Sequence, residues 1–184
     1  MNQITKISDD LMATFGEVFN WVDESDAVLD IPVEKGWTNR QILEHIYLTN
    51  YYLLILIRKG TARALALARK GETNFSVEML DVGAKALSAI GIHNAFSWMR
   101  PAHMEPTGNI QPGEIKSALE YQMIECLDCL RQMPNGEGCL YKTTMTVNNL
   151  GKLDVYQYIY FLQLHMRRHL TQMQINKNAL EKER

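Results

Sequence analysis

The chain has 184 residues, of which 46% are hydrophobic and 22% are charged, and its formal net charge is −2. This composition is typical of a globular protein with a buried core, so we expect a single domain over residues 1–184. The near-neutral charge excludes a strong long-range attraction to nucleic acid, which we do not expect as a partner. The longest apolar runs, such as residues 51–57, are too short to cross a bilayer, and no N-terminal segment has the pattern of a signal peptide. We therefore expect a cytoplasmic protein with no membrane partner.

The first half of the chain predicts two long helices. In residues 4–22 the apolar side chains recur at steps of three and four, which places them on one helix face. A second helix begins after Thr38, whose side chain can cap it, and Gln41 stands three residues on, where the partner in a capping box belongs. This helix runs through Leu56 at least, and residues 61–70 are expected to continue it.

The second half predicts two more helices. One covers residues 114–133 and ends at a Pro-Asn-Gly sequence, residues 134–136. The other begins with Asp154 as its N-cap and continues to about Asn178. Residues 140–147 come nearest to the alternation of a strand, and one short hairpin would not change the fold class. Four amphipathic helices predict an all-α protein, a four-helix bundle.

A long connection separates the second predicted helix from the third. It covers residues 71–111 and contains a weaker helical pattern at residues 77–90. Loops longer than about 12–15 residues without structure of their own are uncommon. The length therefore predicts a long crossover along the bundle, which lets the second and third helices run parallel.

The cysteines offer a possible redox or zinc site, which their context does not favour. Cys126 and Cys129 form a CxxC sequence inside the predicted helix 114–133, with no βαβ pattern around it. No second CxxC completes the four ligands of a structural zinc site. We expect both thiols to be buried and chemically inert, and Cys139 to lie in a loop.

Two histidines on the last helix suggest a metal site. His165 and His169 lie four residues apart, so their side chains share one face of the helix. Tyr158, Leu162 and Gln172 lie on the same face, and we expect this face to pack against the other helices. Imidazoles on such a face need polar partners, and a metal ion would be one. The alternative is a pair of histidines on a solvated, charged helix.

A catalytic metal site would need a third ligand. His45 lies on a partly apolar face of the second helix, where a hydrogen-bonded core histidine is the alternative. His93 and His103 lie in the connection 71–111 and have no helical register. Three histidines with further positions open to water are typical of a catalytic site, whereas structural sites are closed.

Two segments of the chain carry a resemblance to a known family. They are GWTNRQILEHIYLTN at residues 36–50 and NNLGKLDVYQYIYFLQLHMRRHLTQM at residues 148–173. Together they resemble the DinB-like superfamily of candidate metalloenzymes, also called YfiT-like. WMRPAHMEPTG at residues 98–108 is similar to the crossover loop of these proteins, so the resemblance spans essentially the whole chain.

The resemblance implies a fold and a ligand set. The fold is a four-helix bundle with up-down-down-up connectivity. One histidine of the second helix and two of the fourth hold a divalent metal, and by position these are His45, His165 and His169. Nickel or zinc is the expected ion, because imidazole suits both. Many relatives carry His-Pro where this chain has Asn148-Asn149, which leaves the subfamily and the substrate open.

The resemblance also implies a class of function. Members of the superfamily include thiol transferases and isomerases that use low-molecular-weight thiols such as bacillithiol or mycothiol. We therefore expect a metal-dependent enzyme that transfers such a thiol, as co-substrate, to a small electrophile, with hydrolysis of a small molecule as the competing reaction. The alternative is a non-catalytic metal-binding stress-response protein. Relatives are often homodimers, and the apolar run 51–57 also favours a homodimer.

The sequence does not identify a general acid or base. Glu44 adjoins His45, but consecutive residues of a helix point about 100° apart, so its carboxylate is expected to face away. Trp37, Tyr47 and Tyr158 lie near the candidate ligands, where their rings could line a pocket. At helical spacing they could equally be core residues.

Overall fold

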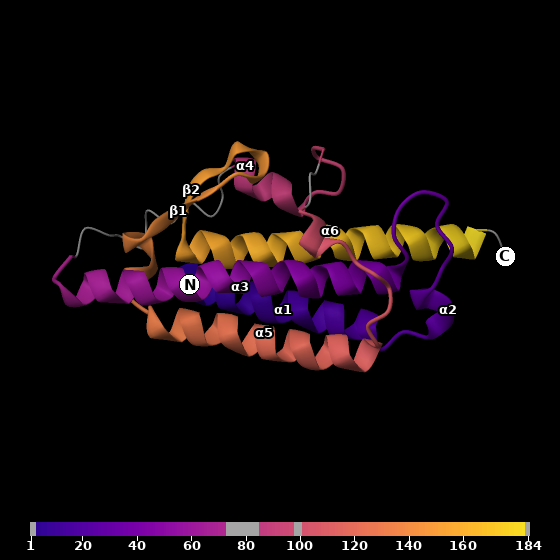
Figure 1. Ribbon diagram of the computed structural model, residues 1–184, viewed down its shortest axis with the longest axis horizontal. Helices are drawn as coiled ribbons and strands as arrows, with labels where there is room; N and C mark the ends of the chain where they lie inside the picture. Colours follow the sequence, from indigo (N-terminus) through magenta and orange to yellow (C-terminus); the bar gives the residue numbers. More distant parts are fainter. Residues whose placement is uncertain (1–2, 73–84, 98–100, 183–184) are drawn as a thin grey trace.

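Four long helices form the body of the molecule in the computed structural model, which describes residues 3–72, 85–97 and 101–182 (Figure 1). They are α1 (Gln3–Val22), α3 (Asn39–Arg69), α5 (Pro112–Gln132) and α6 (Val155–Lys182). Both α1 and α3 pack against α5 and α6. The predicted all-α class is confirmed. No helix among the described residues is long and apolar enough to span a membrane.

Several short elements connect these helices. Helix α2 (Asp26–Leu29) follows α1, and α4 (Lys85–Ser88) lies in the connection between α3 and α5. Strands β1 (Lys142–Met145) and β2 (Gly151–Asp154) form an antiparallel hairpin before α6. Single turns of 3-10 helix cover Ala89–Gly91, Ala102–Met104, Glu137–Leu140 and Val147–Asn149.

Reciprocal capping fixes the first residues of two helices. The Gln41 N–H donates to the Thr38 hydroxyl over 3.3 Å, and the Thr38 N–H donates to the Gln41 side chain over 3.0 Å. The same exchange joins Asp154 and Gln157, with both distances 3.0 Å. Each exchange satisfies backbone N–H groups that the helix leaves unpaired. Both predicted N-caps are therefore confirmed.

The predicted bounds differ from the observed ones by a few residues. Helix α3 continues without a break through Gly60, as expected. A Cβ atom at Gly60 would lie 3.0 Å from Val155 Cγ2, so the glycine lets α3 approach the start of α6 closely. Helix α6 runs to Lys182, beyond the predicted end near Asn178. Strand β1 lies inside residues 140–147, the segment whose sequence came nearest to the alternating pattern of a strand.

The described parts of the connection between α3 and α5 pack on α3 and α6. Its turn Ala89–Gly91 packs on α6, and its turn Ala102–Met104 packs on α3. The described part of the helical pattern expected at 77–90 is helical, and residues 77–84 lie outside the described residues. In Figure 1 the colours of α3 and α5 progress toward the same end of the bundle.

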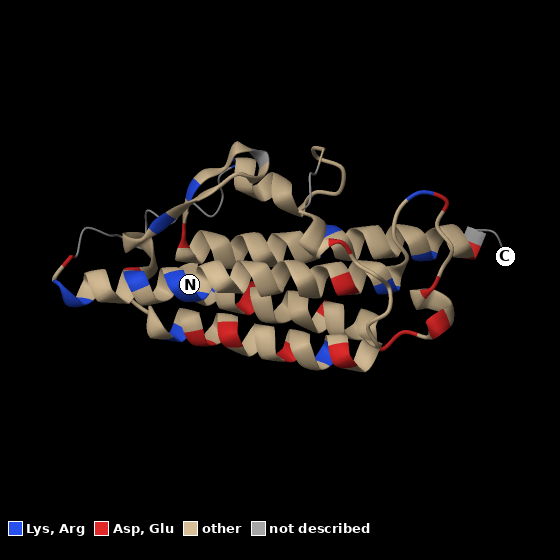
Figure 2. Cartoon of the chain, viewed as in Figure 1, with Lys and Arg blue, Asp and Glu red and all other residues tan. Residues whose placement is uncertain are grey.

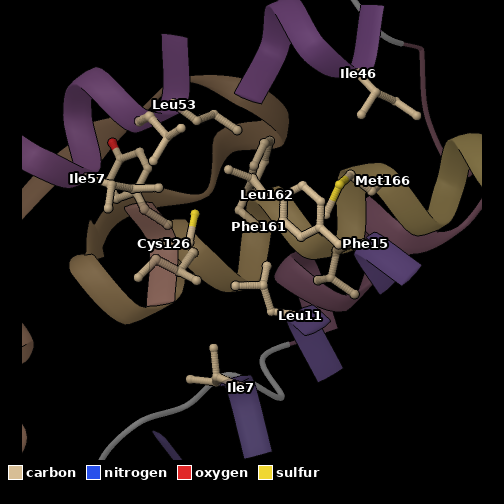
Figure 3. Close-up of a cluster of buried hydrophobic side chains, with 14 of the residues drawn as sticks. Ile7, Leu11, Phe15, Ile46, Leu53, Ile57, Cys126, Phe161, Leu162 and Met166 are labelled. Carbon is tan, nitrogen blue, oxygen red and sulfur yellow. The ribbon is translucent and has the colours of Figure 1, made fainter. Parts of the chain in front are cut away.

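The core lies between the four long helices. Figure 3 shows apolar side chains from all four in one buried cluster. They include Leu11 and Phe15 of α1, Leu53 and Ile57 of α3, Cys126 of α5, and Leu162 and Met166 of α6. Charged residues recur along α5 in Figure 2. Cys126 and Cys129 are both buried, as predicted, and burial raises the pKa of the Cys126 thiol.

Candidate metal centre

The structure brings three of the five histidines together. His45 comes from α3, and His165 and His169 come from α6. All three are buried, and one ring nitrogen of each lies within 4.8 Å of the other two. The Nε2 atoms of His165 and His169 are 3.2 Å apart. No other group of this kind occurs among the described residues.

Hydrogen bonds orient two of the three rings. His45 Nδ1 lies 2.8 Å from the carbonyl oxygen of Met104, and His169 Nδ1 lies 3.0 Å from the side-chain oxygen of Gln172. These oxygens accept hydrogen bonds and do not donate them, so both Nδ1 atoms carry the proton. Each Nε2 atom is then unprotonated and carries the lone pair through which an imidazole binds a metal, and partners of this kind commonly orient metal-binding histidines.

The buried rings are in the protonation state that a metal needs. Burial lowers the pKa of His165 and of His169 well below the ordinary value, and neighbouring positive charge lowers it further. Both imidazoles are therefore neutral at pH 7. Because only the neutral ring binds a metal, the environment favours ligation over protonation.

The spacing of the nitrogens also fits one ion. With metal–nitrogen bonds of about 2.0–2.1 Å, two ligands at an octahedral or tetrahedral angle lie about 2.8–3.4 Å apart. The 3.2 Å between His165 Nε2 and His169 Nε2 lies in that range. The donor set is three imidazoles, which suits zinc and nickel.

The three histidines open onto a pocket of about 530 Å³. Its described lining comes from the segment before α3, from α3 and α6, from the connection between α3 and α5, and from the end of β1 with the turn that follows it, with no residue of α1 or α5. His165 and His169 of α6 thus share the pocket with α3 and the crossover.

The three aromatic residues considered from the sequence have different places. Trp37 lines the pocket, and its ring centroid lies 4.6 Å from that of His45 and 6.4 Å from that of His169. Tyr47 and Tyr158 are not part of the lining. Tyr158 is buried and accepts a hydrogen bond from the Thr143 hydroxyl over 3.0 Å, so the core interpretation is correct for it.

Glu44 contacts the crossover and not the pocket. Its buried carboxylate accepts hydrogen bonds from the Thr107 N–H over 2.9 Å and from the Gly108 N–H over 2.6 Å. Gly108 has a φ of +78°, a conformation that favours glycine. Adjacent residues of α3, Glu44 and His45, thus bind the crossover at two points. Glu44 anchors the segment whose Met104 carbonyl orients His45.

Sequence reasoning missed two pocket residues, Arg168 and His93. Arg168 is only 8% exposed, and its guanidinium lies at hydrogen-bonding distance from His169 Nε2. Burial lowers its pKa to about 10, so it stays charged at neutral pH. His93 comes from the crossover, and burial lowers its pKa. His103 is exposed beside Tyr52 and lies apart from the cluster.

Comparison with known proteins gives one match. A family model described as the DinB superfamily matches residues 9–173, which include the three clustered histidines. No curated protein and no solved structure was found to match the chain.

Proposed function

The chain belongs to the DinB superfamily, and from this membership and the histidine cluster we propose that it is a metal-dependent enzyme. It has the up-down-down-up order of helices and binds one divalent ion, nickel or zinc, through His45, His165 and His169. It transfers a low-molecular-weight thiol to a small electrophile, and hydrolysis of a small molecule is the competing reaction.

One observation carries the proposal: three imidazoles converge beside a pocket of about 530 Å³. A site with three protein ligands leaves further coordination positions for a substrate. The volume suits a small molecule. A bundle that only stored or sensed metal would not need such a pocket, so the pocket favours an enzyme over the non-catalytic alternative.

The chain's own residues give the pocket its chemical character. His45 and His169 present Nε2 because Met104 and Gln172 accept the proton at Nδ1. Trp37 adds an aromatic surface beside the rings of His45 and His169. When bound, a divalent ion at such a site acts as a Lewis acid and lowers the pKa of a thiol or water beside it.

The proposed transfer balances without an oxidant or reductant. The thiol releases its proton to solvent, and its sulfur forms a bond to the electrophilic carbon. The leaving group departs with the electron pair of the bond that breaks. In hydrolysis, water replaces the thiol. The substrate's sulfur is the nucleophile, so Cys126 and Cys129 take no part.

The test is a panel of small thiols with a chromogenic aryl halide. Metal-loaded protein, metal-stripped protein and His169→Ala are compared, with His103→Ala as a control outside the cluster. We expect thiol conjugation only in metal-loaded wild type and His103→Ala. Conjugation that is no faster with metal across the panel would favour the non-catalytic function. Activity lost in Cys126→Ser but retained without metal would overturn the mechanism.

We also propose that the protein is a cytoplasmic homodimer. Its three cysteines are free, in keeping with a reducing compartment. Tyr51 and Ile55 of α3 are 48% and 41% exposed, so the apolar run 51–57 leaves large side chains on the surface. Light scattering at micromolar concentration should give twice the monomer mass, and a mass of 21.2 kDa would contradict the dimer.

A further inference from the structure

The pocket above the histidine cluster holds a positive charge that the proposed reaction leaves unassigned. We propose that Arg168 binds an anionic group of the substrate, and that the substrate is therefore a small organic acid with an apolar body and one carboxylate. The inference rests on the proposed function, because it names the substrate class of the same pocket.

The position of Arg168 follows from the helix that carries the histidines. Arg168 lies three residues after His165 and one before His169, so α6 presents it at the edge of the histidine face. Its guanidinium lines the pocket and lies beside His169 Nε2. A carboxylate bound there would thus lie next to the candidate metal ligands.

The charges of the pocket favour an anion. Among the described lining residues, Arg168 is the only Lys or Arg, and none is Asp or Glu. A carboxylate that enters this pocket therefore meets one positive side chain and no negative one from that lining. The planar guanidinium can donate two parallel hydrogen bonds to a carboxylate, and such charged pairs are stronger than neutral ones. A divalent ion on the three neutral histidines would add positive charge in the same place.

The remaining lining favours an apolar body. Trp37, Phe96 and Phe161 present aromatic surface, and Leu53 and Met104 present aliphatic surface. Binding sites for small molecules commonly combine a mostly apolar wall with a few polar groups that fix the orientation. Here the wall would hold the apolar body, and Arg168 would orient the molecule through its carboxylate.

Benzoate and benzamide are matched probes for this inference, because they share ring and shape and differ in charge. Their binding to metal-free protein is measured by titration calorimetry. We expect wild type to bind benzoate at least about tenfold more tightly than benzamide, as a charged hydrogen bond predicts. Arg168→Gln should lose that preference, and Arg168→Lys should keep only part of it, because lysine retains the charge but not the two parallel hydrogen bonds. Benzamide binding should be the same in all three proteins.

Two results would overturn the inference. One is equal affinity of wild type for benzoate and benzamide, which needs no variant and so does not depend on whether Arg168→Gln folds. The other is a benzoate preference that survives unchanged in a folded Arg168→Gln protein, with folding checked by circular dichroism. Failure of the proposed function is separate: protein that takes up no metal would refute it, while the benzoate result in metal-free protein would stand.

Discussion

The two sides of α6 are equally buried and chemically different. Toward α1, Gln163 donates to the Thr14 hydroxyl over 3.0 Å, and its neighbours are core side chains such as Leu162. Toward α3 and the crossover, the same helix presents His165 and His169. Burial alone therefore does not distinguish core from site. The α1 side packs the helix into the core, and the crossover side presents the candidate metal ligands.

Removal of a large side chain on the core side should have the largest effect on stability. Phe15 of α1 is fully buried and is not part of the pocket lining. We expect Phe15→Ala to lower the free energy of unfolding by about 3–5 kcal/mol, through lost burial and a cavity. Zinc bound per folded molecule should not change. Urea unfolding measures the stability, and elemental analysis measures the bound zinc. A loss of metal from folded Phe15→Ala would contradict the claim that the α1 side of α6 does not affect metal binding.

Removal of a candidate ligand on the crossover side should have the opposite result, with the larger effect on zinc binding and the smaller one on stability. We expect His165→Ala to weaken zinc binding by more than about 100-fold, since even partners behind a ligand contribute about 10–100-fold. Competition with a chromogenic chelator measures the affinity. His93→Ala and His103→Ala are the controls and should retain the ion. Equal metal loss in all three would indicate general unfolding and not ligation.

Glu44 anchors the crossover to α3, and its substitution should moderately affect both stability and zinc affinity. In Glu44→Gln the amide keeps one oxygen for the N–H groups of Thr107 and Gly108 but loses the negative charge. We expect a loss of about 1–3 kcal/mol in stability and about tenfold in zinc affinity, because the crossover that orients His45 loosens. Glu181→Gln, at an exposed site of α6, is the matched control. An effect no larger than that of Glu181→Gln would show that the anchor is unimportant.

The smallest expected effect is a change in stability when the N-cap of α6, Asp154, is replaced, and this change depends on pH. Burial raises the pKa of Asp154 above its ordinary value of 3.8. The native state therefore holds this proton more firmly than the unfolded state, and the contribution to stability is lost as pH rises through the raised pKa. Asparagine can cap the helix without the charge. Asp154→Asn should thus be slightly more stable than wild type at pH 7, by about 1 kcal/mol per unit of pKa shift.

The comparison of thermal unfolding at several pH values checks this sign. The advantage of Asp154→Asn should shrink as pH falls and vanish below pH 3.8, once the carboxyl group of wild type is protonated in both states. Asp154→Ala, which removes the cap, should be less stable at every pH. If the stability advantage of Asp154→Asn over wild type grew toward low pH, that result would contradict a raised pKa of Asp154.

Local rules predicted the helices and the candidate ligands well. The caps Thr38 and Asp154 each act with a glutamine three residues on, so the signal lies within one turn of the chain. His165 and His169 share a face because of their spacing alone. The pairing of that face with His45 came from the resemblance to a family, since no local rule connects two helices far apart in sequence.

The parts that were not predicted depend on tertiary docking. The Met104 carbonyl reaches His45 only because the crossover lies on α3, and nothing in the local sequence sets that position. Arg167 and Arg168 are adjacent arginines, yet one is exposed and the other lines the pocket. Helical periodicity separates their directions by about 100° but does not say which neighbour occupies each direction.

Anomalous X-ray scattering is the most direct test of the metal centre. Crystals of protein purified without an affinity tag would be equilibrated with zinc or nickel and measured at the absorption edge of each metal. We expect one strong peak between the ring nitrogens of His45, His165 and His169, at about 2.0–2.2 Å from each. No peak in that position after equilibration with either ion, or a strong peak only elsewhere, would contradict the assignment of these three histidines as metal ligands.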